Sequence, residues 1–143
     1  MPLGLFLYKS LTRLITPFLG VIFRRRAKSG KEDPARIAER FSESPPPRPD
    51  QNLIWFHAAS VGESQILLEL ARRLLSAGLS DVTFLFTCQT QTAAHLVEKA
   101  ISSEPLLKAE TCLQLMAPID ESKIVERFLD HWAPSLAIFA EGE

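Results

Sequence analysis

Four short apolar runs alternate with helix-like segments over the carboxyl-terminal two-thirds of the chain, and this alternation constrains the fold most. The runs have strand length and cover residues 52–58, 81–87, 111–116 and 135–140. Between them, residues 63–77, 90–101 and 121–132 place apolar side chains at helical spacing. Strands that are apolar throughout are typical of a parallel sheet covered by helices on both faces. The sequence therefore predicts an α/β fold with four parallel strands, a Rossmann-like half. Because an open parallel sheet normally continues through another crossover, the run that ends at residue 140 predicts part of a longer fold.

Charge is distributed unevenly along the chain. The 143 residues are 46% hydrophobic and 23% charged, which excludes a disordered or fibrous protein. Residues 1–31 hold seven of the 16 Lys and Arg residues, whereas all 17 acidic residues follow them. A basic surface is therefore confined to one end, and we expect no nucleic-acid partner. The two cysteines, Cys88 and Cys112, lack the spacing of a zinc site or a disulfide framework, so we expect reduced thiols and no metal.

The amino-terminal segment suggests contact with a membrane. Residues 3–23 are mostly apolar and long enough to cross a bilayer, but Lys9 and Arg13 interrupt them. On a helix these two cations share one face, which favours a helix that lies in the membrane interface. Arg24, Arg25 and Arg26 follow, as expected for a cytoplasmic flank near anionic headgroups. A core helix of a larger protein is the alternative interpretation.

The composition predicts three regions. Residues 1–31 form the membrane-associated anchor and its basic flank, and residues 51–143 form the Rossmann-like domain. Residues 32–50 are a linker rich in proline, with a short helix predicted over residues 34–41.

Ligands of such folds bind outside the carboxyl ends of the strands, so the strand-to-helix turns hold the candidate site residues. After the first strand, Gly62 permits close backbone approach, and Glu63 is either a first-turn residue favoured by the helix dipole or a general base. After the second, the threonines of residues 87–93 cap the next helix or bond a sugar or phosphate. Asp120 is expected to cap the third helix. Glu141 and Glu143 follow the last strand.

Several familiar chemistries have no counterpart in the sequence. It contains no glycine-rich phosphate loop, no HExxH motif and no GxSxG nucleophile elbow. His95 and His131 are expected on helix surfaces, and His57 is expected to pack near a strand end.

Residues 55–63, WFHAASVGE, resemble the HxxSVGE signature of the 3-deoxy-D-manno-octulosonic acid (Kdo) transferases. Further resemblances follow the order of the family's motifs: Arg36 with residues 39–41 (R…ERFG), Thr87, Thr90 and Thr92 (TxxTxTG), residues 117–120 (P-x-D), and residues 127–129, Pro134 and residues 141–143 (RFL…P…ETE). The chain departs from these motifs at Ser42, Ala93 and Gly142, where the family has glycine, glycine and threonine.

The resemblance implies the amino-terminal, acceptor-binding half of a two-domain GT-B glycosyltransferase, with the donor-binding carboxyl-terminal domain absent. It implies inverting transfer of Kdo from CMP-Kdo to a lipid A precursor, without a metal or cofactor, at the cytoplasmic side of the inner membrane. Glu63 would be the general base and Glu141 a transition-state stabiliser. The remaining matched or flanking residues are expected to bind substrate (Ser60, Gly62, Thr90, Thr92 and Glu143) or to contact membrane and lipid phosphates (Lys9, Arg13, Arg24, Arg25 and Arg26).

This half alone is expected to be inactive. A truncated, noncatalytic module that binds lipid A or membrane is the alternative function. A nucleotide-binding Rossmann protein of another class is a third hypothesis, but the sequence contains no glycine-rich loop that would support it.

Overall fold

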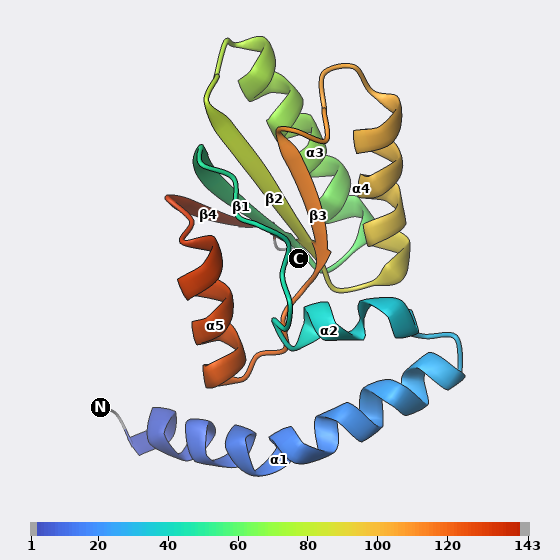
Figure 1. Ribbon diagram of the computed structural model, residues 1–143, viewed down its shortest axis with the longest axis vertical. Helices are drawn as coiled ribbons and strands as arrows, with labels where there is room; N and C mark the ends of the chain where they lie inside the picture. Colours follow the sequence, from blue (N-terminus) through green and yellow to red (C-terminus); the bar gives the residue numbers. More distant parts are fainter. Residues whose placement is uncertain (1–2, 141–143) are drawn as a thin grey trace. The chain divides into compact units, whose positions relative to one another are not determined.

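The computed structural model describes residues 3–140, and the chain divides into two compact units (Figure 1). One unit comprises residues 1–45 and 118–131, and the other comprises residues 46–117 and 132–143. The side chains of Lys9 and Arg13 lie outside the description, as do Glu141, Gly142 and Glu143. The expected roles of these residues therefore remain predictions.

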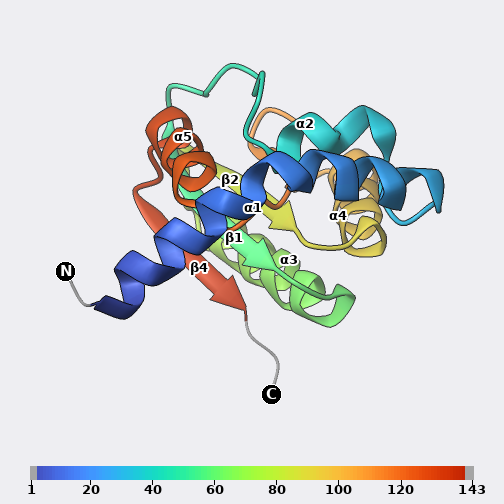
Figure 2. The same ribbon diagram turned by 90° about the horizontal axis from the view of Figure 1, so that it is seen from below.

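The second unit contains the predicted parallel sheet. Its strands are β1 (Asn52–Ala58), β2 (Val82–Cys88), β3 (Cys112–Met116) and β4 (Leu136–Ala140). All neighbouring strands pair in parallel in the order β3-β2-β1-β4, and Figure 2 shows β1 between β2 and β4. The α/β class and the four parallel strands predicted from the apolar runs are confirmed.

One face of the sheet is covered by α3 (Val61–Ser76) and α4 (Gln91–Ser103), which lie side by side in Figure 1. Phe56 of β1 stacks on Phe84 of β2 at 5.3 Å between ring centroids. Every residue of β2 is buried, as expected for a central strand of a covered parallel sheet. The core on this face is built mainly from Phe56, Ala58, Leu67, Leu68, Phe84, Phe86, Ala94 and Val97.

The first unit is helical. It contains α1 (Leu3–Lys28), a 3-10 turn at Pro34–Arg36, α2 (Ile37–Arg40) and most of α5 (Ser122–Trp132). The helix expected over residues 34–41 is therefore two short turns rather than one helix. Arg36 causes the break, since its backbone (φ −109°, ψ 4°) leaves the helical region. None of the described helices combines the length and the hydropathy that crossing a bilayer requires.

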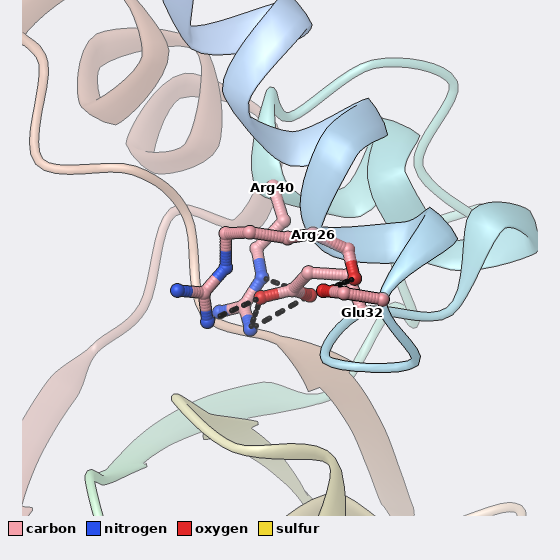
Figure 3. Close-up of polar contacts among 4 residues, drawn as sticks. Arg26, Glu32 and Arg40 are labelled. Carbon is pink, nitrogen blue, oxygen red and sulfur yellow. Dashed lines mark hydrogen bonds and ion pairs between the residues drawn. The ribbon is translucent and has the colours of Figure 1, made fainter.

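An ion cluster joins the end of α1 to α2. Glu32 is 5% exposed, and its carboxylate accepts hydrogen bonds from Arg40 Nε at 3.3 Å and Arg40 Nη2 at 3.2 Å. Arg26 Nη2 approaches the same carboxylate at 3.4 Å, and Figure 3 shows both guanidinium groups converging on it. Both guanidinium groups also lie within 6 Å of the Phe23 ring. Arg40, the arginine of the ERF sequence at residues 39–41, is therefore held by an ion pair with Glu32 in this chain.

Candidate active site at the carboxyl end of β1

The strand order places a topological switch point at β1. The chain runs from β1 outward to β2 and β3, and then returns to place β4 on the other side of β1. In open parallel sheets the crevice that binds ligands lies at the carboxyl ends of the strands where the order reverses. The segment that leaves β1 at this point is the turn Ala59–Ser60, which leads into α3.

Ser60 and Glu63 fix that turn through a capping box. Ser60 Oγ accepts a hydrogen bond from the Glu63 backbone N–H at 3.3 Å. In return, Glu63 Oε2 accepts from the backbone N–H groups of Ala59 at 2.6 Å and Ser60 at 3.3 Å. These bonds satisfy backbone N–H groups at the start of α3. Glu63 therefore has a structural role at the same position where a general base is expected.

The absence of a side chain at Gly62 leaves open space beside the backbone of the turn. A Cβ atom built on Gly62 would meet no atom within 4 Å, so no contact among the described residues requires glycine there. The space is consistent with the expected close approach of a ligand to this backbone.

The turn after β2 lies beside the turn after β1. Ala58 pairs with Cys88, and the Gln89 backbone N–H donates to the Ala58 carbonyl at 3.0 Å. Thr90 caps α4 by accepting from the Ala93 N–H at 3.2 Å, which confirms that a threonine of this segment is a cap. The Thr92 side chain is exposed.

Ala93 occupies a position where the family motif has glycine. It is fully buried in the core of this unit, so its methyl group packs inside the protein. The departure from the motif therefore has a packing explanation in this chain.

A polar group that the sequence motifs do not indicate lies on the other face of β1 and β2. Thr87 Oγ1 accepts from Trp55 Nε1 at 2.8 Å and lies 2.9 Å from His57 Nδ1. Burial lowers the pKa of His57, and the nearby charge of Glu63 opposes this shift. The expectation that His57 packs near the strand end is confirmed, but the buried hydroxyl that binds it was missed. The contact depends on the parallel pairing of His57 with Thr87, which the sequence pattern does not specify.

The expected cap at Asp120, in the first unit, is wrong. The Asp120 carboxylate accepts from the Tyr8 hydroxyl at 2.6 Å. Glu121 makes the capping bonds, since its Oε2 accepts from the N–H groups of Lys123 at 3.1 Å and Ile124 at 3.3 Å. Both acids precede a helix, and the sequence alone did not distinguish them.

The structure thus brings Ser60, Gly62 and Glu63 together and places Thr90 at the neighbouring strand end. Arg24, Arg25 and Arg26 belong to the first unit, at the end of α1, and all three are exposed. Cys88 and Cys112 are free and buried, and burial raises the pKa of Cys112 to about 11. Among the residues that the structure describes, no cluster of three His, Cys, Asp or Glu side chains could hold a metal ion.

Comparisons with known proteins give the same family as the sequence motifs. A family model described as 3-deoxy-D-manno-octulosonic-acid transferase (kdotransferase) matches residues 35–143. The 3-deoxy-D-manno-octulosonic acid transferase of Rickettsia bellii is 39% identical over 137 residues, which cover 96% of this chain and 31% of the relative. A probable mitochondrial transferase of the same name from Arabidopsis thaliana is 34% identical over 146 residues, covering 100% of this chain and 31% of the relative. No solved structure matches the chain.

The chain spans about a third of the length of these curated relatives. The family model covers more than half of the chain, and the region that it matches contains the whole sheet and the capped turn of Glu63. The chain belongs to the Kdo transferase family, of which it contains the amino-terminal domain.

Proposed function

We propose that this chain is the acceptor-binding half of a GT-B enzyme that transfers Kdo from CMP-Kdo to a lipid A precursor. The observation that carries the proposal is the position of Glu63, whose carboxyl group is held in the capped turn at the switch point of the sheet. Family membership supports the reaction class, and a domain in the remaining length of such an enzyme would bind CMP-Kdo.

In the proposed reaction, an acceptor hydroxyl oxygen attacks the anomeric carbon of Kdo while the bond from that carbon to CMP breaks. Glu63 takes the hydroxyl proton, CMP leaves with the electron pair, and the anomeric configuration inverts. Glu141 stabilises the charge that develops in the transition state, and no metal takes part. The matched positions Ser60, Gly62, Thr90, Thr92 and Glu143 line the substrate site.

We propose further that α1 lies in the interface of the inner membrane, on its cytoplasmic side. Three apolar side chains of α1 are largely exposed: Leu11 at 59%, Leu14 at 72% and Phe18 at 65%. Arg24 and Arg25 are exposed one to two turns farther along, where they can meet lipid phosphates. Arg26 joins them, although Glu32 already engages part of its guanidinium group. Lys9 and Arg13 would extend this contact.

Transfer of radiolabelled Kdo from CMP-Kdo to a tetraacylated lipid A precursor tests the proposed reaction. We expect activity only when the chain is extended through a donor-binding domain. In that protein, Glu63→Gln keeps the capping geometry but removes the base, so kcat should fall by about 10²- to 10⁴-fold. Glu69→Gln on the exposed part of α3 is the matched control and should leave kcat unchanged. Near-wild-type turnover of Glu63→Gln would remove Glu63 from the role of base, and inactivity of the folded, extended protein would favour a noncatalytic lipid-binding module.

Co-sedimentation with liposomes that contain anionic lipid tests the membrane contact. Deletion of residues 1–23, or the double change Leu14→Ser and Phe18→Ser, should release the protein into the supernatant. The matched control changes two exposed apolar residues of the other unit, Ile66→Ser and Leu106→Ser, and should leave sedimentation unchanged. Equal sedimentation of all variants would refute the interfacial helix.

A further inference from the structure

A buried hydroxyl connects two side chains of β1. Thr87 is fully buried, and its Oγ1 lies 2.8 Å from Trp55 Nε1 and 2.9 Å from His57 Nδ1. Trp55 and His57 are two residues apart on one strand, so both face the side of the sheet opposite to Phe56. Thr87 pairs with His57 in the parallel register, which places its hydroxyl between the two rings.

The hydrogen bonds of the Thr87 hydroxyl are coupled to the choice of nitrogen that carries the proton of His57. An indole N–H can only donate, so Trp55 uses a lone pair of the Thr87 oxygen. The Thr87 proton has two acceptors within reach, His57 Nδ1 at 2.9 Å and the Phe56 carbonyl at 3.5 Å. In the Nε2–H form of a neutral His57, Thr87 donates to Nδ1 over the shorter contact. In the Nδ1–H form, His57 donates to Thr87, and Thr87 donates to the Phe56 carbonyl.

The ring of His57 is also held in place by its neighbours. It makes edge-to-face contacts with Phe139 at 5.3 Å and with Trp55 at 6.4 Å between centroids. His57 is half-buried, and burial lowers its pKa, which favours the neutral ring. Among the residues that the structure describes, none accepts a hydrogen bond from Nε2. In the Nε2–H form of His57, this N–H group is therefore available to a ligand.

We propose that His57 is neutral with its proton on Nε2, and that Nε2–H donates a hydrogen bond to an oxygen of the acceptor sugar, beside the hydroxyl that Glu63 deprotonates. Thr87 and Trp55 are the positioning residues, because together they hold the ring in the Nε2–H form. A neutral His57 ring suits a position beside the reacting hydroxyl, because it can orient the acceptor sugar without competing with Glu63 for the hydroxyl proton. The identity of the ligand rests on the proposed function, whereas the protonation state of His57 does not.

Two substitutions at His57 separate the roles of its nitrogens. Gln extends an amide N–H toward the position of Nε2, whereas the shorter Asn matches the position of Nδ1. We expect His57→Gln to bind acceptor within about twofold of wild type and His57→Asn to bind about three- to tenfold more weakly, the range for one hydrogen bond. Thr87→Val removes the hydroxyl at nearly constant shape and should release the ring from a single protonation form.

The experiment is nitrogen NMR of the chain labelled at histidine, before and after titration with a tetraacylated glucosamine disaccharide bisphosphate in detergent micelles. His57 is assigned from the His57→Gln spectrum, and His95→Gln, at an exposed position of α4, is the control. We expect a neutral Nε2–H form in wild type, a mixture in Thr87→Val, and a shift of the Nε2 resonance when acceptor binds.

Each outcome decides a separate point. A His57 that is protonated, or protonated on Nδ1, at pH 7 would overturn the orientation argument whether or not acceptor binds. Equal acceptor affinity of wild type and His57→Asn would overturn the hydrogen bond while leaving the proposed function intact. Absence of acceptor binding by the folded wild-type chain would overturn the proposed function and, with it, the assigned ligand of His57.

Discussion

The ion pair between Glu32 and Arg40 gives the sharpest prediction about stability. Their side chains are each 4% exposed, and Arg40 Nη2 lies 3.2 Å from both carboxylate oxygens. Burial lowers the pKa of Arg40, and the Glu32 carboxylate opposes that effect. Glu32→Gln removes the carboxylate charge that bonds directly to the buried Arg40 guanidinium group. We expect the free energy of unfolding to fall by about 3 to 5 kcal/mol, as for a buried pair that loses one partner.

A second ion pair provides the control because it differs mainly in burial. Arg72 and Glu104 bond twice at 2.7 Å, a shorter distance than in the Glu32 pair, but each is about one-third exposed. Glu104→Gln should therefore cost no more than about 1 kcal/mol, because solvent screens an exposed pair. The double replacement Glu32→Leu and Arg40→Met removes both buried charges and should cost less than Glu32→Gln alone.

Urea unfolding followed by circular dichroism measures these differences, and amide hydrogen exchange over residues 29–40 locates them. Exchange in this segment should accelerate in Glu32→Gln and stay unchanged in Glu104→Gln. The reasoning would be refuted if Glu32→Gln were no more destabilising than Glu104→Gln, or if the double replacement were the least stable variant.

Three further predictions concern single residues. Ser42 has φ +51° and a buried hydroxyl without a hydrogen-bond partner, so Ser42→Gly, which restores the family's glycine, should stabilise the protein by about 1 kcal/mol in urea unfolding; a loss of stability would contradict this. Thr90→Ala removes the cap of α4 and should cost about 1 kcal/mol by the same measurement, whereas the exposed Thr92→Ala should cost less than about 0.5 kcal/mol. Burial raises the pKa of Cys112 from 9.0 to about 11, so an unfolded chain ionises first and stability should fall between these pH values, by up to about 2 kcal/mol. Thermal unfolding at several pH values should show this fall, and an equal fall in Cys112→Ala would assign it to other groups.

The order of elements could be predicted from the sequence because each strand of the buried sheet is apolar by itself. The runs at residues 52–58 and 81–87 correspond to β1 and β2 within one residue at each end. Local chemistry also located the turn before α3, where Gly62 and Glu63 follow the apolar run, whereas the capping box of Ser60 and Glu63 was found only in the structure. These features depend on residues that are close in the chain.

Features that depend on tertiary pairing could not be predicted in the same way. Glu32 is the first acid after a basic segment, and only the folded structure shows that it is buried in an ion pair with Arg40. The bond of Thr87 to Trp55 and His57 requires the register of two strands, which the apolar pattern does not specify. Likewise, Glu121 caps the helix while Asp120 accepts from the Tyr8 hydroxyl, more than 100 residues away in the chain, and the sequence pattern shows neither bond.

The capping box at the start of α3 links local order to the catalytic cycle that we propose. If Glu63 accepts a proton in each turnover, the carboxylate that bonds the N–H groups of Ala59 and Ser60 becomes a neutral acid. Those bonds weaken for the lifetime of that acid, and they strengthen again when the proton leaves for solvent. The first turn of the helix would then loosen and tighten once for every sugar transferred. Deprotonation of Glu63 and re-formation of the capping bonds would then be the same event. The enzyme would be ready for the next acceptor as soon as these bonds had re-formed.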